Sequence, residues 1–116
     1  MERMMIVEDH SAFAQALGLV LGEGTHISLA RTLEESRTLL RGDEPFDVVV
    51  LDLSLPDGEG TELVPEIRHR NPSTRVVILS ARDDVGEVAS EAGADAAIPK
   101  ETSLPEIVST LKRLTG

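Results

Sequence analysis

The chain has no cysteine, no tryptophan and no tyrosine, and it has only two phenylalanines among its 116 residues. Without cysteine it can form neither a disulfide framework nor a thiolate metal site, which suits a reducing cytoplasm. With so few aromatic rings it lacks the platforms on which nucleic-acid bases or flavins stack. These absences favour protein partners and small ions.

Positive charge and long apolar runs are also scarce. Eleven Lys and Arg residues are outnumbered by 21 Asp and Glu residues, which gives a formal net charge of −10. Such a surface repels nucleic acid and anionic lipid, so we expect this domain itself to bind no nucleic acid and no membrane. The sequence shows no transmembrane-length apolar run and no signal peptide. Its length suits one domain with one core.

The sequence does contain a regular alternation of strand-like and helix-like segments. Short apolar runs, rich in β-branched residues, predict strands at residues 4–7, 26–30, 48–51, 76–79 and 95–98. Patterns of period 3.6 predict helices at residues 13–21, 33–41, 61–69, 84–93 and 103–114.

Local signals mark where these helices begin and weaken. Capping boxes are expected where Thr32 precedes Glu35 and where Ser103 precedes Glu106, and Asp83 or Asp84 is expected to cap the fourth helix. Pro65 should disturb the first turn of the third helix, and Gly86 should weaken the fourth by about 1 kcal/mol relative to alanine. The face of the first helix is predicted to comprise Phe13, Ala16, Leu17, Val20 and Leu21.

Five strands joined by helical crossovers predict an α/β fold of the (βα)5 type. Its parallel sheet would have helices on both faces, and the commonest order of five such strands is 2-1-3-4-5. Ligands of such sheets bind beyond the carboxyl ends of the strands, between strands 1 and 3.

Polar residues follow the predicted strands at this edge. Glu8 and Asp9 follow the first strand, Asp52 the third, Ser80 the fourth and Lys100 the fifth. Two carboxylates about 4 Å apart repel by roughly 4 kcal/mol at an effective dielectric constant near 20, so three of them require a compensating cation. Mg²⁺ prefers such oxygen ligands. With a lysine and a hydroxyl nearby, the cluster has the groups needed to hold a phosphoryl group on a carboxylate nucleophile.

Four motifs carry a resemblance to a known family. They are "VEDH" after the first strand, "LDLSLPDGEG" after the third, "ILSA" after the fourth and "IPK" after the fifth. In this order and spacing they resemble the receiver domain of two-component response regulators over essentially the whole chain. The resemblance implies the flavodoxin-like receiver fold and a single receiver domain at residues 1–116, either alone or as the N-terminal part of a longer regulator.

The resemblance also implies a role for each residue at the site. Asp52 would accept a phosphoryl group from a sensor histidine kinase, with Ser80 and Lys100 contacting the phosphoryl oxygens. The domain would then catalyse only its own phosphorylation and dephosphorylation rather than act as an enzyme on other substrates.

A magnesium site is the second implication of the resemblance. Asp9, Asp52 and the main-chain carbonyl of Ser54 would hold Mg²⁺, and Glu8 would assist through a water molecule. The "LPDGEG" motif, and a lysine that proline does not follow, resemble the branch with LuxR-type helix-turn-helix output domains. A DNA-binding domain C-terminal to residue 116, a transcriptional output, a homodimer and a cytoplasmic location are therefore expected.

Two positions depart from the family pattern. Glu101 follows Lys100, where most receivers have proline, and Pro99 precedes it. Ala97 occupies the position at which many receivers carry an aromatic switch residue. We therefore expect the switch region of Ser80, Arg82 and Ala97 to work without a ring. The alternative is a receiver-fold interaction module that does not depend on phosphorylation.

Two rival functions fit the sequence less well. A haloacid-dehalogenase-like phosphatase needs a second acid at the position of Ser54, and a flavodoxin-like carrier would place Glu8 and Asp9 against a phosphate. Asp57 is interpreted as a turn former between Pro56 and Gly58. The histidines are interpreted as solvated surface residues: His10, His26 and His69.

Overall fold

Five parallel strands form the central sheet of the structure, a computed structural model that describes residues 2–22 and 24–115. Their order across the sheet is β2-β1-β3-β6-β7, which in chain order of these five is the predicted 2-1-3-4-5. The strands are β1 (Glu2–Val7), β2 (Thr25–Ala30), β3 (Val48–Asp52), β6 (Arg75–Ser80) and β7 (Ala96–Pro99). The predicted fold class is therefore confirmed.

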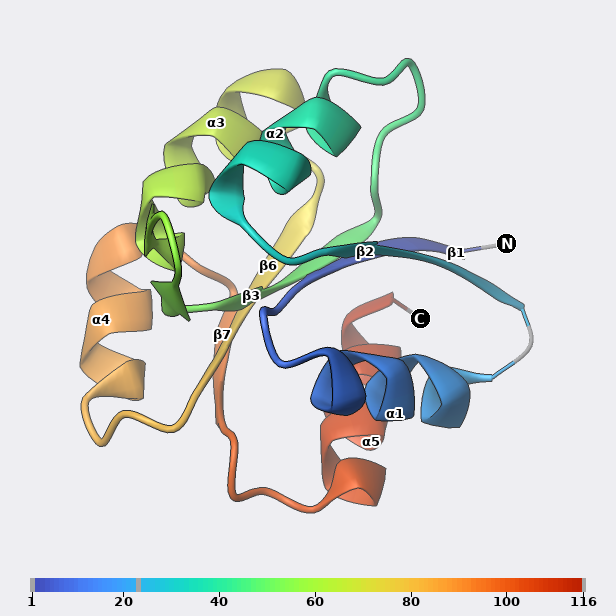
Figure 1. Cartoon of the computed structure of the whole chain (residues 1–116), viewed down its shortest axis with the longest axis vertical. Coiled ribbons are helices and arrows are strands. Elements are labelled where there is room, and N and C mark those ends of the chain that lie inside the picture. Colours follow the sequence, from blue (N-terminus) through green and yellow to red (C-terminus); the bar gives the residue numbers. More distant parts are fainter. Residues whose placement is uncertain (1, 23, 116) are drawn as a thin grey trace.

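The helices cover both faces of this sheet, as Figure 1 shows. One face carries α1 (Ser11–Leu21) and α5 (Leu104–Thr115). The other carries α2 (Leu33–Leu40), α3 (Leu63–Arg70) and α4 (Val85–Ala92). Of the helices in the described part of the chain, none is long and apolar enough to cross a membrane.

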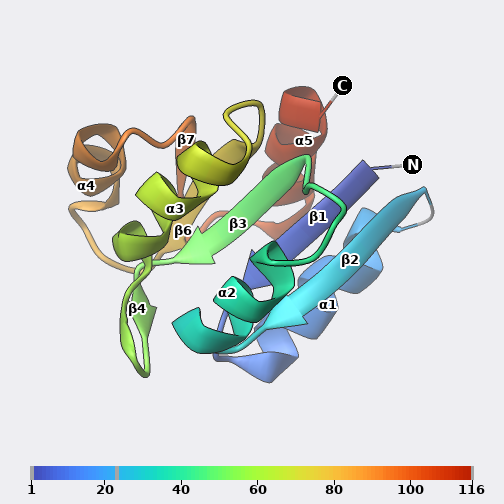
Figure 2. The same cartoon turned by 90° about the horizontal axis from the view of Figure 1, so that it is seen from above.

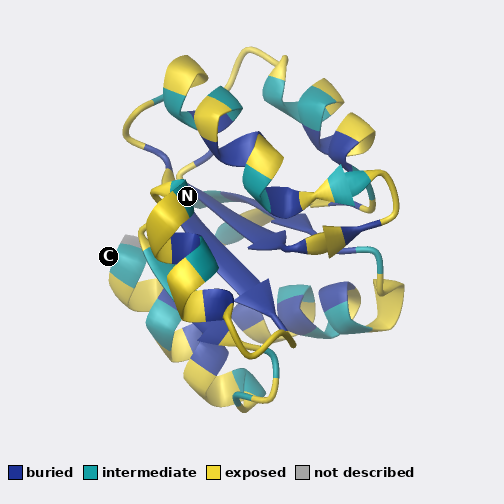
Figure 3. Ribbon diagram, turned by 90° about the vertical axis from the view of Figure 1, so that its left-hand side faces the viewer, coloured by how far each residue is buried: buried dark blue, intermediate teal, exposed yellow. Residues whose placement is uncertain are grey.

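The strands feed two separate apolar clusters because successive side chains point to opposite faces of a sheet. In β3, Val49 and Leu51 pack with α2, α3 and α4, whereas Val48 and Val50 pack with α1 and α5. Figure 3 shows the buried strands lying between helices whose outer faces are exposed. This double burial explains the continuous apolar runs that predicted the strands.

The first helix buries a different stripe from the predicted one. Ala14, Leu17 and Leu21 are buried, but Val20 is 44% exposed, so the prediction for Val20 was wrong. The buried positions are spaced at i, i+3 and i+7, which makes a narrow stripe against the sheet and α5 and leaves Val20 outside it.

The start of the third helix is irregular, as Pro65 predicted. A 3₁₀ turn, η1 (Gly60–Glu62), precedes α3, and Pro65 lies in the first turn of α3, where a missing N–H is tolerated.

The fourth helix begins without the predicted side-chain cap. Asp84 occupies the N-cap position, but its carboxylate accepts hydrogen bonds from the Arg82 guanidinium, at 3.1 Å from Nε and 2.9 Å from Nη2. This two-pronged, charge-assisted contact occupies both oxygens of the Asp84 carboxylate. The helix ends, as predicted, at Gly93, whose φ of 82° is in the left-handed region.

A short hairpin that the sequence did not predict follows β3. It pairs β4 (Ser54–Leu55) with β5 (Gly58–Glu59) and projects beyond the end of β3 (Figure 2). Asp57 lies in its turn, as expected, but it also reaches α2, where Oδ1 accepts from the Leu33 N–H at 2.9 Å and Oδ2 from the Glu34 N–H at 3.1 Å. The hairpin therefore ties the segment after Asp52 to the start of α2.

Candidate functional site

The carboxyl ends of the strands bring the predicted site residues to one edge of the sheet. Glu8 and Asp9 follow β1, Asp52 ends β3, Ser80 ends β6 and Lys100 follows β7. Buried strands carry these positions, so Glu8, Asp52 and Ser80 are only 2–5% exposed. Such burial gives the carboxylates strong effects on one another.

Lys100 is the cation that compensates the buried carboxylates in this structure. Its Nζ lies 2.6 Å from Glu8 Oε1 and 3.3 Å from Asp52 Oδ2. It also lies 5.3 Å from the centroid of the Phe13 ring. The lysine therefore bridges the ends of β1 and β3 from the end of β7.

The pKa values of the two buried carboxyl groups, Glu8 and Asp52, shift in opposite directions. Burial raises the pKa of Asp52, and the negative charge of Glu8 raises it further. Lys100 and the hydrogen bond from the Ser54 N–H lower this pKa by less. Burial also opposes ionisation of Glu8, but hydrogen bonds from Lys100 and His10 outweigh it and lower the pKa of Glu8. Glu8 therefore forms the stronger ion pair with Lys100, and the ionised form of Asp52 still requires positive charge nearby.

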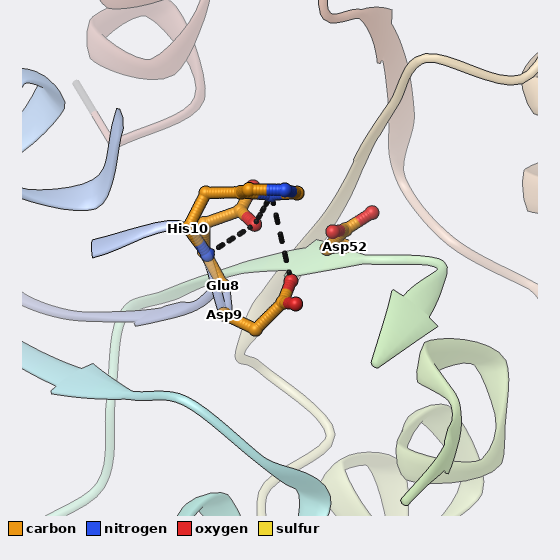
Figure 4. Close-up of side chains that lie close together, drawn as sticks. All are labelled: Glu8, Asp9, His10 and Asp52. Carbon is orange, nitrogen blue, oxygen red and sulfur yellow. Dashed lines mark hydrogen bonds and ion pairs between the residues drawn. The ribbon is translucent and has the colours of Figure 1, made fainter. Parts of the chain in front are cut away.

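The residues present fit a divalent cation. Ligand atoms of Glu8, Asp9, His10 and Asp52 all lie within 4.8 Å of one another (Figure 4). Asp9 Oδ1 is buried and has no hydrogen-bond partner in the described part of the chain. A buried oxygen without a donor is costly unless something positive binds it. Oxygen ligands of this kind suit Mg²⁺.

Neighbouring backbone groups lie close to Asp52 and restrict which residues fit beside it. Asp52 Oδ1 accepts a hydrogen bond from the Ser54 N–H at 3.3 Å. A Cβ atom added to Gly60 would lie 1.9 Å from the Asp52 carbonyl oxygen, so only glycine fits there. The requirement for glycine at position 60 was not predicted from the sequence, where a glycine after a strand can indicate close backbone approach.

Beyond Asp52, two of the predicted switch residues, Ser80 and Arg82, are joined by a hydrogen bond. The Ser80 hydroxyl accepts from the Arg82 N–H at 3.2 Å, and the Arg82 guanidinium contacts Asp84 and, at 3.4 Å, Glu59. Ala97 is half-buried in β7, where it packs against the α2–α3–α4 cluster and supplies no ring. The contacts thus run from Ser80 through Arg82 to the hairpin and α4.

His10 contacts the acidic site although its side chain is mostly exposed. Its side chain is 71% exposed at the N-cap of α1, as expected of a solvated residue. Its Nδ1, however, lies 3.0 Å from Glu8 Oε2. This contact was not predicted from the sequence, although His10 directly follows two acidic residues.

Comparison with known proteins gives a consistent result. The family model described as "Response regulator receiver domain" matches residues 4–112. Response regulator MprA of Mycolicibacterium vanbaalenii is 32% identical over 97% of this chain and 49% of its own length. Transcriptional regulatory protein PmrA of Pectobacterium parmentieri is 35% identical over 97% of this chain and 51% of its own. The chain therefore spans about half the length of the curated relatives it matches.

The solved structures agree with the family match. The non-phosphorylated receiver domain of HemR from Leptospira biflexa superimposes with a TM-score of 0.89 at 31% identity, over 100% of this chain and 95% of that one. Sequence, fold and the acidic edge of the sheet thus lead to one conclusion: the chain belongs to the response regulator receiver domain family of two-component signalling.

Proposed function

We propose that Asp52 accepts a phosphoryl group from the phosphohistidine of a sensor histidine kinase, with Mg²⁺, and that the phosphorylated domain switches a transcriptional output. The observation that carries this proposal is the position of Asp52. It is a carboxylate only 5% exposed at the end of the central strand β3, with Lys100 Nζ 3.3 Å away.

In the transfer, an Asp52 carboxylate oxygen attacks the phosphorus atom and an O–P bond forms. The P–N bond to the kinase histidine breaks, its electron pair returns to the imidazole nitrogen, and that nitrogen regains a proton. Hydrolysis of the acyl phosphate by water restores the carboxylate and releases inorganic phosphate. The domain would thus catalyse only its own phosphorylation and dephosphorylation.

Two side chains would contact the phosphoryl group. Lys100 would move from the carboxylates to a phosphoryl oxygen, since its ammonium group already contacts Asp52. The Ser80 hydroxyl accepts from the Arg82 N–H, which leaves its own proton available for a phosphoryl oxygen. Lys100 would offset negative charge on the transferred group, and the Ser80 hydroxyl would donate a hydrogen bond to it.

Mg²⁺, when bound, would supply positive charge to the phosphoryl oxygens. Asp9, Asp52 and the Ser54 carbonyl would hold it. Asp9 Oδ1, which has no hydrogen-bond partner among the described residues, supports this assignment. Glu8 Oε1 is already paired with Lys100, which supports an indirect role for Glu8 through water.

The wider assignment follows from the relatives. The name of PmrA describes a transcriptional regulator, and PmrA is about twice the matched length. Residues 1–116 would therefore form one receiver domain, the N-terminal part of a longer cytoplasmic regulator with a DNA-binding output domain. The LuxR-type output, the homodimer and the kinase partner belong to this same proposal.

Acetyl phosphate tests the proposal without a kinase. With Mg²⁺, mass spectrometry should detect one added phosphoryl group on the wild type and none on Asp52→Asn. Asp83→Asn, which alters an exposed aspartate beside α4, is the matched control and should be phosphorylated normally. Equal phosphorylation of Asp52→Asn would refute the assignment of Asp52. No phosphorylation of the wild type would favour the phosphorylation-independent interaction module.

A further inference from the structure

His10 places a ring nitrogen beside a cluster whose other ligand atoms are all carboxylate oxygens. We propose that His10 is a direct ligand of the bound cation. The site would therefore prefer a first-row transition ion over Mg²⁺ more strongly than its carboxylates alone would. This inference rests on the proposed function in one respect, because it takes the acidic cluster to be the metal site.

The spacing of the ligand atoms supports one ion shared between His10 and the carboxylates. His10 Nδ1 lies 3.0 Å from Glu8 Oε2 and 3.6 Å from Asp9 Oδ1. Two adjacent ligands of an octahedral ion, each about 2.1 Å from the metal, are about 3.0 Å apart, so His10 Nδ1 and Asp9 Oδ1 lie near this spacing while Glu8 stays paired with Lys100. Figure 4 shows the ring and the carboxylates of Asp9 and Asp52 bordering the same space. Only a small movement would bring them around a common ion.

The His10 ring can turn to an ion without leaving other groups unpaired. Glu8 Oε2 also accepts the backbone N–H of His10 at 3.1 Å, and Glu8 Oε1 is paired with Lys100. The His10 side chain makes no capping hydrogen bond to α1, although it occupies the N-cap position. Asparagine, aspartate or serine would cap the helix better. The ring thus contributes to the acidic cluster rather than to the helix.

A nitrogen ligand changes which ions bind best. Mg²⁺ is a hard cation that prefers oxygen and exchanges its waters reluctantly for other ligands. Imidazole suits the first-row transition ions, whose affinities rise from Mn²⁺ through Co²⁺ to Cu²⁺. Replacing the ring by an oxygen donor should therefore weaken transition-ion binding and spare Mg²⁺.

Calorimetric titration at one fixed pH with Mg²⁺ and with Co²⁺ tests this selectivity. His10→Asn keeps a residue suited to the N-cap and exchanges the ring nitrogen for an amide oxygen. The Co²⁺ dissociation constant should rise about tenfold, as loss of a metal-orienting contact typically costs at least that much, while the Mg²⁺ constant should change much less. His26→Asn, at an exposed position of β2, is the matched control and should change neither.

A spectroscopic measurement detects the nitrogen directly. Pulsed electron paramagnetic resonance of bound Mn²⁺ should show coupling to ¹⁴N in the wild type and in His26→Asn. The coupling should be absent in His10→Asn.

Each remaining outcome separates this inference from the proposed function. Unchanged constants for both ions in His10→Asn would overturn the inference and leave the magnesium site intact. Equal weakening of both ions would show that His10 acts through Glu8 or the helix start, which also overturns it. If the wild type bound neither ion, the metal site of the proposed function would fail and this inference with it.

Discussion

Lys100 Nζ pairs with Glu8 Oε1 at 2.6 Å, and the Glu8 side chain is only 2% exposed. The end of β7 is therefore joined electrostatically to the end of β1. A carboxylate this deeply buried depends on its partner, since an unpaired buried charge is costly.

Loss of the lysine should destabilise the fold. Lys100→Met leaves Glu8 and Asp52 without their cation, and we expect the free energy of unfolding to fall by about 2 kcal/mol, less than for a fully buried pair. Urea titration measures this change. Lys112→Met removes the same charge from an exposed position of α5 and should have a smaller effect. Adding Glu8→Gln to Lys100→Met should recover part of the loss, and no recovery would show that the two residues do not interact.

Gly60 should tolerate no side chain. Because a Cβ atom there would meet the Asp52 carbonyl oxygen, Gly60→Ala should cost more than about 3 kcal/mol of stability. Gly86 is the matched control: it lies inside α4 with no atom within 4 Å of an added Cβ. Gly86→Ala should stabilise the fold by about 0.5–1 kcal/mol. Similar thermal melting of both variants would contradict the close approach.

The Asp57 contact should stabilise α2 locally. Asp57→Ala removes two acceptors from the N–H groups of Leu33 and Glu34, so hydrogen exchange within α2 should become faster. Asp83→Ala should leave α2 unchanged. Unaltered protection of α2 in Asp57→Ala would mean that water replaces the aspartate without loss.

The contribution of Asp95 should depend on pH. Burial opposes its ionisation, but hydrogen bonds from the Val76 N–H at 2.7 Å and from Arg68 at 2.8 Å outweigh it and lower the pKa of Asp95. Because its pKa is lower in the folded state, Asp95 stabilises the fold at pH values above its unfolded pKa of about 3.9. This stabilisation is lost as the pH falls through the pKa of the folded state.

Asp95→Asn should therefore cost about 1 kcal/mol at pH 7 and progressively less below about pH 4. Denaturant titration across this range measures the difference. Asp43→Asn, at an exposed position before β3, serves as the control. A cost that stays constant from pH 7 to pH 3 would exclude the ionised Asp95 as its source.

Phosphorylation should act through the Ser80–Arg82 segment and α4. A phosphoryl group on Asp52 would draw Ser80 inward and away from the Arg82 N–H. Arg82 in turn holds Asp84 at the start of α4. Beryllofluoride, a phosphoryl mimic, should change hydrogen exchange most strongly between residues 80 and 93. A response confined to α1 or α5 would contradict this route.

The sheet and its functional edge were predictable because they depend on local patterns and one general rule. Apolar runs such as residues 48–51 mark doubly buried strands, and right-handed crossovers leave few strand orders. That order alone brings Asp9, Asp52 and Lys100 to the same edge of the sheet.

The contacts that the sequence did not reveal join residues far apart in the chain. Asp57 and Leu33 are 24 positions apart, and no local pattern distinguishes a turn former from one that also caps a distant helix. The strands β4 and β5 have two residues each, too few for any periodicity. Val20 follows the helical period, but only packing against α5 and the sheet decides which edge of the stripe is covered.

The sheet also divides the interior into two compartments. Met5, Val7 and Val49 belong to one apolar cluster and Met4, Ile6 and Val50 to the other, so neighbours in sequence have different packing partners. Side chains that share packing partners couple more strongly than side chains that do not. Volume changes on the α1–α5 side should therefore couple to one another more strongly than to changes on the side that carries α4.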